Sequence, residues 1–408
     1  MIDIHRVGVA TGGGDTTVLN AQIEKIIEVC DILGIEVYGF IGGWEGVLKK
    51  QGRILRLGEI DPWFGGSDIE NTRTKLEKAK GDYETARTNL RELGIDALIP
   101  IGGDDTLSVA RNLDFLVMGI IKTVDNDVGT MPPANSYDFE KMLSYFTLGF
   151  MKAAFAANDF IAGEYGLITT ARSHRRIMLI ETMGAKSGWM ALSTYPSGPD
   201  LVVIGEYPLN RNLDDLATRI IGIYDAKKEK PYVIVVVAEN ARYEDGTLIS
   251  KDETRTDTFG KAKLGGVVQK LETALSNHPK IRERFPNDPR KITAVTPGHL
   301  YRSGTPHPIE KEIAEQLATA AVLYLIQKKR GVVGVGYNGR GFYPQRIDPQ
   351  EMPVKQDPKT GELIIQERLV DDRFYDPQKM AITEEGRRYY APILRGIEGR
   401  LHHPKNGR

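Results

Sequence analysis

The sequence predicts an α/β protein made of two doubly wound parallel-sheet lobes, followed by a C-terminal extension. Three observations support this prediction. Short β-branched runs alternate with helical patterns, several runs end in loops rich in glycine or aspartate, and the alternation begins again near residue 160. Strands that alternate with helices are typical of a parallel sheet with helices packed on its faces.

The first βαβ unit begins near the N-terminus. Residues 7–11 form an apolar run that ends at the loop GGGD, residues 12–15. Residues 18–33 then carry apolar side chains at helical spacing, and Gly34 is expected to end that helix. Residues 36–41 are predicted to form the next strand. The order strand, glycine loop, helix, strand indicates a parallel pair.

The same order of elements recurs further along the chain. A helix, a strand, a glycine loop, a helix and a strand are predicted at residues 83–93, 97–101, 102–106, 107–112 and 120–121. The last of these strands leads into a second acidic loop, KTVDND, at residues 122–127. Two glycine loops and one acidic loop therefore each follow a predicted strand.

The second lobe is predicted to begin near residue 160. Residues 177–180 and 232–238 are apolar and β-branched enough to be buried parallel strands. The flanking helical patterns and a final helix and strand lie at residues 213–225, 260–275, 313–327 and 332–335.

The C-terminal residues have no clear periodicity. From residue 338 onward the chain is rich in proline, glycine and charge, and we expect it to wrap the surface. We therefore predict a first lobe from residues 1–158 plus about 303–335, a second lobe from 159–302, and an extension from 336–408.

Composition excludes some function classes. The 408 residues contain 54 Lys and Arg against 55 Asp and Glu, so net charge gives no reason to expect nucleic acid or an anionic membrane as partner. The lone cysteine, Cys30, cannot form an internal disulfide and is expected in the core. No signal peptide is apparent, and no run reaches the roughly 18 apolar residues of a spanning helix. The sequence predicts a soluble cytoplasmic protein.

The three loops suggest a phosphate-binding site. Ligands of open parallel sheets bind beyond the carboxyl ends of the strands, so these loops should converge. Glycines let backbone N–H groups approach a phosphate, and a helix N-terminus adds a favourable dipole. The alternative is that the glycines only make tight turns. One such loop would leave both readings open, whereas three acidic loops together favour the phosphate site.

The carboxylates match two needs of phosphoryl transfer. One must take a proton from the attacking hydroxyl, and another should hold Mg²⁺ against the donor phosphates. Asp125 and Asp127 would share one face if their loop were a regular extended strand, so one could act as base and the other as its support. A solvated loop with an Asx-turn is the alternative that this spacing leaves open.

Several motifs resemble those of the phosphofructokinase family. The loops at 102–106 and 122–127 are similar to its GGD[GD][ST] and PKTIDND loops, and GGSDIENTRT resembles its GGT…SSRT loop. Further similar segments, in family order, lie at residues 173–184, 237–241 and 297–306. The resemblance runs from residue 7 to about 330 and implies two lobes with the active site between them.

The resemblance also implies roles for the catalytic residues. Asp125 would be the general base, and Asp127 would support it electrostatically. Thr123 would sit beside the transferring phosphoryl group, and Asp104 would hold Mg²⁺. Arg73 would neutralise charge that develops on the phosphoryl oxygens.

Two further sets of residues would bind the substrates. The donor phosphates would contact Gly13, Gly14, Gly103, Asp105, Thr106 and Lys122. The acceptor would contact Arg176, Met183, Gly184, Glu239, His299 and Arg302. Of these, Arg176 would reach in from a neighbouring subunit, which implies a homodimer or homotetramer with a shared active site.

Two positions indicate pyrophosphate as the donor. Members that use ATP have glycine at the positions of Asp105 and Lys122, which leaves room for the nucleotide. A carboxylate there would repel and block a nucleotide, whereas the lysine would offer a cation to a short diphosphate. The alternative is that both are surface substitutions with no bearing on the donor.

The motifs leave two classes of acceptor open, because two arginines of the family pattern are missing. Ala185 and Thr293 stand where they would fall. A bidentate arginine contact is not replaced by threonine, although Lys186, Arg290 or Lys291 could compensate. The acceptor is then fructose 6-phosphate or a longer sugar phosphate, or else an unphosphorylated polyol such as inositol, a sugar or a nucleoside.

Two readings from other classes remain. A non-catalytic regulatory member of the family would have no use for the base that Asp125 would provide. A dinucleotide-binding dehydrogenase is suggested by the GxGxxG at residues 334–339, but Pro344 is a poor continuation for the helix that this fingerprint requires.

Overall fold

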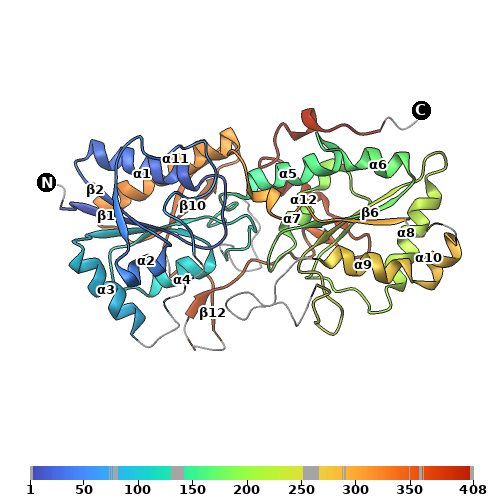
Figure 1. Cartoon of the computed structure of the whole chain (residues 1–408), viewed down its shortest axis with the longest axis horizontal. Helices are drawn as coiled ribbons and strands as arrows, with labels where there is room; N and C mark the ends of the chain where they lie inside the picture. The colour runs from blue at the N-terminus through green and yellow to red at the C-terminus, as the bar shows by residue number, and fades with distance from the viewer. Residues whose placement is uncertain are drawn as a thin grey trace. The chain divides into compact units, whose positions relative to one another are not determined.

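The structure is a computed structural model that describes residues 3–72, 74, 76, 81–129, 142–250, 266–286, 288, 291–348, 350–357, 361 and 363–404. The chain divides into two compact units. Unit 1 contains Met1–Lys152 and Arg302–Arg368, and unit 2 contains Ala153–Tyr301 and Leu369–Arg408. The segment expected as a C-terminal extension, 336–408, is thus divided between the units (Figure 1).

Unit 1 is built on a seven-stranded sheet with the order β11-β10-β5-β4-β1-β2-β3. Its strands are β1 (Arg6–Thr11), β2 (Glu36–Phe40), β3 (Gly52–Leu55), β4 (Ala97–Gly102), β5 (Met118–Ile121), β10 (Gly331–Tyr337) and β11 (Phe342–Ile347). The five central strands are parallel, and the edge strands β3 and β11 pair antiparallel with their neighbours.

Helices cover both faces of this sheet. They are α1 (Leu19–Ile32), α2 (Trp44–Lys49), α3 (Asp82–Glu92), α4 (Asp104–Asn112) and α11 (Pro308–Ile326). Figure 1 shows α1 and α11 on one face and α2, α3 and α4 on the other. Phe40, Trp44, Leu90 and Leu98 belong to one buried cluster that joins three of these helices to the strands. This is the doubly wound arrangement that the alternation of strands and helices predicts.

Unit 2 contains a smaller parallel sheet with the order β7-β8-β6-β9. Its strands are β6 (Ile177–Thr182), β7 (Leu201–Val203), β8 (Val233–Ala238) and β9 (Ile292–Val295). Its helices are α5 (Phe150–Ala162, of which the first residues belong to unit 1), α6 (Leu167–Ser173), α7 (Trp189–Leu192), α8 (Asp214–Ala226), α9 (Val267–Ser276), α10 (Pro279–Arg284) and α12 (Glu384–Tyr390). All six residues of β6 and of β8 are buried, as their continuous apolar runs predict.

The prediction of an α/β protein with two parallel sheets is confirmed, and Cys30 is buried as expected. Burial raises the pKa of the Cys30 thiol to about 12, so this thiol stays protonated at neutral pH. The expected helix at 260–275 is present from Val267 to Ser276, and residues 260–265 lie outside the described part. None of the described helices is long and apolar enough to span a membrane.

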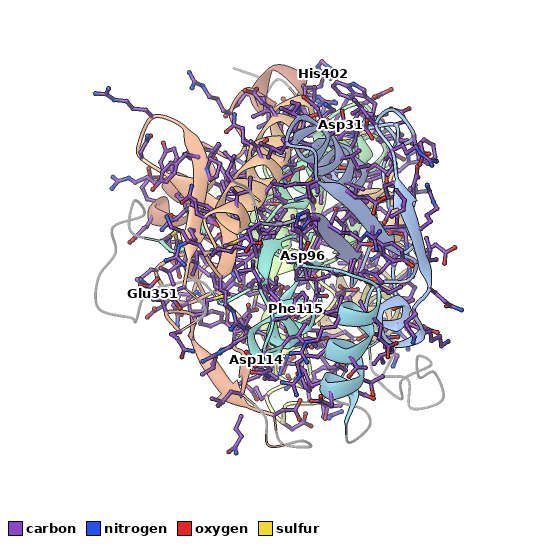
Figure 2. The ribbon with its side chains drawn as sticks, turned by 90° about the vertical axis from the view of Figure 1, so that its left-hand side faces the viewer. Asp31, Asp96, Asp114, Phe115, Glu351 and His402 are labelled. Atoms are coloured by element: carbon purple, nitrogen blue, oxygen red, sulfur yellow. The ribbon has the colours of Figure 1, made fainter. Side chains whose placement is uncertain are left out.

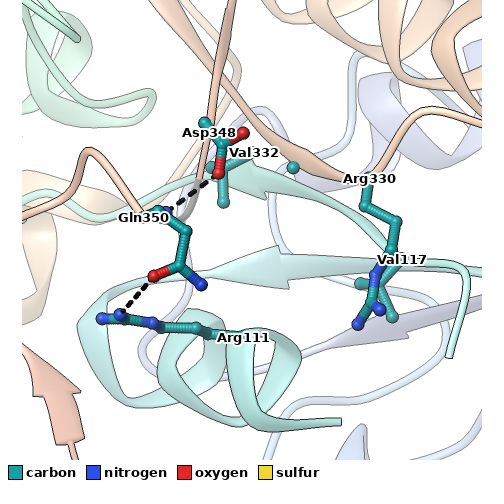
Figure 3. A pocket seen from close by; sticks show the side chains of 7 residues that line it. Arg111, Val117, Arg330, Val332, Asp348 and Gln350 are labelled. Carbon is teal, nitrogen blue, oxygen red and sulfur yellow. Dashed lines mark hydrogen bonds between the residues drawn. The ribbon is translucent and has the colours of Figure 1, made fainter. Parts of the chain in front are cut away.

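The two ends of the parallel strands in unit 1 carry different features. Asp96 and Phe115 lie just before β4 and β5, so Figure 2, which labels them, shows the edge where these strands begin. A cavity of about 270 Å³ lies at this edge, where β5 and β10 begin. It is lined in part by Arg111, whose guanidinium donates to Gln350 Oε1 at 3.4 Å (Figure 3). The glycine and acidic loops follow the other ends of the strands.

The prediction that residues after 338 only wrap the surface is wrong. Strand β11 completes the large sheet, and the GxGxxG at 334–339 lies on β10 and the turn into β11 rather than at the start of a helix. Shorter pairs follow as β12 (Val354–Gln356) with β13 (Leu363–Ile365), and β14 (Tyr375–Asp376) with β15 (Ala381–Ile382).

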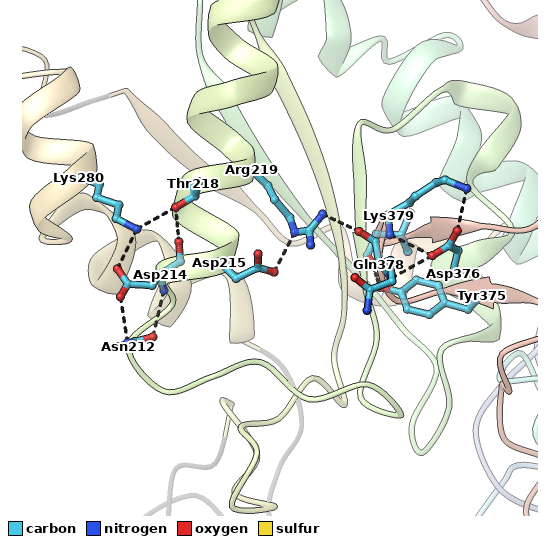
Figure 4. A network of polar contacts seen from close by, with 11 residues as sticks. Asn212, Asp214, Asp215, Thr218, Arg219, Lys280, Tyr375, Asp376, Gln378 and Lys379 are labelled. Carbon is cyan, nitrogen blue, oxygen red and sulfur yellow. Dashed lines mark hydrogen bonds and ion pairs between the residues drawn. The ribbon is translucent and has the colours of Figure 1, made fainter.

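The last part of the chain contributes aromatic side chains to the core of unit 2. Phe374 and Tyr389 are fully buried, and their rings lie 5.0 and 5.3 Å from that of Trp189. Polar contacts add to this packing, because Arg219 of α8 donates to the carbonyl of Gln378 at 2.7 Å (Figure 4). These single aromatic anchors are spaced without a helical or strand period, so periodicity could not reveal them.

Candidate active site

The loop after β1, which we call the glycine loop (residues 12–14), is held by backbone bonds. Gly12 N donates to Ile101 O at 3.0 Å, and Gly13 N donates to Thr72 O at 3.2 Å. Gly13 has a φ of +81°, a conformation that residues with a side chain seldom adopt. The glycine at position 13 is therefore required by the turn itself.

The loop after β4 leads directly into α4. Asp104 and Asp105 occupy the first helical turn, where the helix dipole favours negative charge. Thr106 is buried, and a Cβ added at either Gly12 or Gly102 would lie 2.4 Å from its hydroxyl. The two loops therefore pack so closely that only glycine fits at these positions.

The loop after β5, which we call the acidic loop (residues 122–128), begins with a buried lysine. Lys122 is 1% exposed, and its Nζ donates to the carbonyls of Gly12 and Gly14, both at 2.8 Å. Burial lowers the pKa of Lys122 to about 8; the charges of Asp15 and Asp125 oppose this shift and that of Arg302 adds to it. The ammonium thus ties the acidic loop to the glycine loop.

Asp125 is oriented by its neighbour Thr123. The Thr123 hydroxyl donates to Asp125 Oδ2 at 3.2 Å and accepts from Asp125 N at 3.2 Å. Burial raises the pKa of Asp125, and the charge of Asp104 raises it further. The Thr123 hydrogen bond, Arg302 and Lys122 lower the pKa of the same carboxyl. Asp125 is thus a desolvated carboxylate beside two cations, as is common for an acid or base of an active site.

The acidic loop is not the regular extended strand that would put Asp125 and Asp127 on one face. Asn126, between them, has a φ of +56°, which asparagine tolerates better than most residues. Its side chain is buried, and Asn126 Oδ1 accepts from Thr147 N at 3.0 Å. The condition under which the two carboxylates would share a face is therefore not met, because the loop turns at Asn126.

Arg302 lies beside the glycine loop within unit 1. It is the last residue of the 3₁₀ turn Gly298–Arg302, and its Nη1 is 2.4 Å from the place a Cβ on Gly14 would take. Its charge acts on both Asp125 and Lys122. This residue, predicted for the acceptor's phosphate, is therefore close to the glycine loop and the acidic loop.

Three predicted acceptor residues come together at the carboxyl ends of β6 and β8. Glu239 Oε1 accepts from Gly184 N at 3.0 Å and from Ala185 N at 2.8 Å, and Met183 precedes this turn. Gly184 has a φ of +149°, and a Cβ there would lie 2.5 Å from the carbonyl of Ser187. The turn thus fixes a carboxylate at the end of the unit 2 sheet.

One predicted acceptor residue, Arg176, is not brought to this turn within unit 2. Arg176 precedes β6, and Thr293 pairs with Met178 in the same sheet, so both lie where β6 begins. A six-residue strand, about 20 Å long, separates them from the turn. His299 is exposed. Lys291 is mostly buried with its ammonium 4.7 Å from the centre of the Tyr224 ring, so it does not replace a phosphate-binding arginine.

Arg73 and a Mg²⁺ site are the two remaining features that the sequence predicts. Arg73 lies outside the described residues, but its neighbour Thr72 accepts the hydrogen bond from Gly13 N. Among the residues that the structure describes, no three His, Cys, Asp or Glu side chains form a metal cluster. A Mg²⁺ ion would fit without one, since it often takes only one or two carboxylates plus substrate phosphates.

Sequence reasoning missed two residues that contact the acidic loops. The Ser108 hydroxyl donates to the carbonyl of Asp104 at 2.7 Å, and Arg368 N donates to the carbonyl of Asp127 at 2.6 Å. Neither residue belongs to a recognisable motif. Their contacts are to backbone carbonyls, which leave no signature in the sequence.

Comparison with known proteins agrees with this geometry. The family model described as "Phosphofructokinase" matches residues 6–325. A "Pyrophosphate--fructose 6-phosphate 1-phosphotransferase" of Amycolatopsis methanolica is 35% identical over 325 residues, which is 78% of this chain and 86% of the relative. An "ATP-dependent 6-phosphofructokinase 3" of Streptomyces coelicolor is 33% identical over 324 residues, with the same coverage.

A solved structure extends the likeness of fold to nearly the whole chain. The crystal structure of a pyrophosphate-dependent phosphofructokinase from Marinobacter aquaeolei matches 99% of this chain and 94% of its own, with a TM-score of 0.72. At 19% identity this match concerns the fold alone. It includes the C-terminal residues that lie beyond the family model.

Proposed function

We propose, because the chain belongs to the phosphofructokinase family, that it transfers a phosphoryl group from pyrophosphate to fructose 6-phosphate. As a member of this family it is a phosphotransferase with an alcohol group as acceptor. The observation that supports the reaction best is the desolvated Asp125 carboxylate, held by Thr123 close to the charges of Lys122 and Arg302.

In this proposal Asp125 takes the proton from the acceptor hydroxyl as that oxygen attacks the donor phosphorus, the bridging P–O bond of pyrophosphate breaks and inorganic phosphate leaves. Thr123 orients the carboxylate, and the charges of the two cations oppose the rise in its pKa that burial causes. Asp127 adds negative charge that favours a protonated Asp125 after transfer. Arg302 and Arg73 would neutralise charge on the transferring oxygens, which is the main source of catalysis in phosphoryl transfer.

Asp104 would hold Mg²⁺ against the donor phosphates, with Asp105 beside it in the first turn of α4. The ion would neutralise the phosphate oxygens and fix the donor in line with the acceptor. The charge of Asp104 also raises the pKa of Asp125, which shows that the two carboxylates are near one another. A divalent cation between the donor and Asp104 would relieve this repulsion.

Pyrophosphate is the proposed donor because of Asp105 and Lys122. The relatives do not decide the point, since one is named for pyrophosphate and another for ATP at similar identity. The ammonium of Lys122 donates to the carbonyls of Gly12 and Gly14, in the loop expected to hold the donor phosphates. A buried cation there favours a compact, highly charged diphosphate, while the Asp105 carboxylate would repel a nucleotide.

Fructose 6-phosphate is the proposed acceptor because both relatives are named for it or for phosphofructokinase activity. One observation favours the alternative of an unphosphorylated polyol, sugar or nucleoside. Ala185 and Thr293 lack the expected guanidinium groups, and Lys291 points into aromatic rings instead of compensating.

A shared active site is part of the proposal. Arg176 lies where β6 begins, whereas Gly184 and Glu239 lie where β6 and β8 end. One chain therefore cannot offer all three to a single sugar phosphate, which supports the expectation that Arg176 serves the site of a neighbouring copy. The protein would then be a homodimer or homotetramer.

The test is a turnover panel with matched donors. Product formation is measured with Mg-pyrophosphate and with Mg-ATP, each against fructose 6-phosphate, sedoheptulose 7-phosphate, myo-inositol and nucleosides. We expect turnover of fructose 6-phosphate with pyrophosphate, and reversal with inorganic phosphate. Turnover only with ATP would overturn the donor assignment, and turnover only of an unphosphorylated acceptor would overturn the acceptor assignment.

A further inference from the structure

We infer that residues 363–368, which we call the strap, position the acidic loop for catalysis, and that Arg368 is the positioning residue. The inference rests on the proposed role of the acidic loop. The family match ends at residue 325, well before the strap begins. The strap therefore lies outside every motif that identifies the family.

The guanidinium of Arg368 contacts the backbone of the acidic loop and of the segment 144–145. Arg368 is 3% exposed, and its Nε donates to the carbonyl of Asn126 at 3.0 Å. Its Nη1 donates to the carbonyls of Tyr145 at 3.3 Å and Ser144 at 3.4 Å. One planar group thus links the turn at Asn126 to the segment 144–147, whose Thr147 N–H in turn binds the Asn126 side chain.

The backbone of the strap continues this contact along the loop. Arg368 N donates to the carbonyl of Asp127 at 2.6 Å, and Val128 forms an antiparallel bridge with Glu367. The approach is so close that a Cβ on Gly129 would lie 2.0 Å from the carbonyl of Gln366. The strap and the acidic loop therefore run side by side with no space for a side chain between them at this point.

The middle of the strap reaches α4, the helix whose first turn carries Asp104. Ile365 N donates to the Ser108 hydroxyl at 2.9 Å, and that hydroxyl donates to the carbonyl of Asp104 at 2.7 Å. Ile365 is buried in the same apolar cluster as Val128. One short segment thus contacts both the acidic loop and α4, so it links the elements that carry the proposed base and the proposed metal ligand.

Arginine is suited to this role for physical reasons. Buried carbonyls without a donor destabilise a fold, and a guanidinium offers five N–H groups in one fixed plane. Lysine carries the same charge but places its donors on a single atom. A lysine at 368 could not bond to the carbonyls of Asn126 and Tyr145 with the same geometry. The acidic loop would then be held less firmly in its position.

The effect on catalysis follows from the sensitivity of the reaction to position. A displacement of about 1 Å in a reacting group can cost about 10²-fold in rate. We therefore expect Arg368→Gln to lower kcat by about 10- to 100-fold, with KM for each substrate changed less than about three-fold. Arg368→Lys should fall between this variant and wild type. This split distinguishes misplaced catalytic groups from weakened substrate binding.

The chain offers a matched control. Arg346 is a second arginine of the C-terminal segment in unit 1, and its Nη1 donates to the carbonyl of Arg330 at 2.7 Å. That carbonyl lies just before β10, at the sheet edge away from the acidic loop. Arg346→Gln therefore makes the same chemical change without touching the loop, and its kcat should stay within about two-fold of wild type.

Amide hydrogen exchange supplies a readout that does not depend on activity. Peptides that cover residues 123–129 should exchange at least about ten-fold faster in Arg368→Gln, and unchanged in Arg346→Gln, under conditions where both remain folded. If Arg368→Gln does not fold, Arg368→Lys carries the same comparison. Unchanged loop exchange would overturn the inference, as would a KM effect without a kcat effect. If loop exchange is faster in Arg368→Gln but the wild-type protein turns over no substrate, only the proposed function is rejected.

Discussion

The acidic loop and the strap lie side by side in unit 1, but they differ in which atoms carry their role. The acidic loop presents ionisable side chains, and burial and neighbouring charges shift the pKa values of Lys122 and Asp125. The strap acts through backbone groups and one guanidinium that binds carbonyls. Changes in the first should therefore alter chemistry with little effect on the fold, whereas changes in the second should alter both.

The strongest test of this difference removes the proposed base. We expect Asp125→Asn to lose about 10²–10⁴-fold in kcat, the usual contribution of a general base. Its free energy of unfolding should be equal to or higher than that of wild type, because burial already disfavours the Asp125 carboxylate. Steady-state kinetics and urea unfolding on the same preparation provide both numbers. Turnover close to wild type would reject Asp125 as the base.

This contrast also explains what the sequence could predict. The two sheets, the glycine loops and the acidic loop follow from β-branched runs, glycine positions and carboxylate spacing, because each of these local patterns has one common structural solution. The orientation of Asp125 and Asp127 did not follow, since alternation assumes an extended strand and Asn126 turns the loop.

The supports of the loop could not be predicted for a different reason. Arg368 and Ser108 bind backbone carbonyls, and Arg368 is 242 residues from Asn126 in the sequence. Every residue has a backbone carbonyl, so the sequence does not indicate which carbonyl is bound. The C-terminal residues showed no periodicity because they contribute single anchors, such as Phe374, rather than whole faces. Only the packed structure reveals which carbonyls lack a helix or sheet partner.

Glu310 combines the features of the acidic loop and the strap, because it holds backbone N–H groups and is itself ionisable. Its buried carboxylate accepts from Gly149 N at 2.8 Å, Met151 N at 2.9 Å and Lys152 N at 3.0 Å. The residue just before them, Leu148, accepts from Thr123 N at 3.0 Å. Glu310 thus holds the segment that pairs with the start of the acidic loop at Lys122 and Thr123.

This support should have a pH dependence that the strap lacks. Burial raises the pKa of Glu310 to about 7 in the folded protein, from 4.5 for a glutamate in the unfolded chain. The protonated form is thus favoured in the native state, and the stability it contributes is complete below about pH 4.5 and is lost as pH rises through 7. The free energy of unfolding of wild type, minus that of Glu310→Gln, should shrink by at most about 3 kcal/mol between pH 4.5 and 7.5. Urea unfolding across this range measures the difference; a constant difference would contradict the shift.

The smallest expected effect tests the contact between the strap and the loop directly. Gly129→Ala would place a Cβ 2.0 Å from the carbonyl of Gln366, so the two backbones must separate. We expect a loss of about 1–3 kcal/mol in the free energy of unfolding, the usual result of overpacking, together with a several-fold lower kcat.

Gly222→Ala in α8 is the matched control, since nothing lies within 4 Å of a Cβ at that exposed position. There the same substitution should raise stability by about 0.5–1 kcal/mol, because alanine favours the helix, and leave kcat unchanged. If Gly129→Ala instead behaves like Gly222→Ala in both measurements, the acidic loop tolerates displacement of the strap. The two segments would then be neighbours in space without being coupled in function.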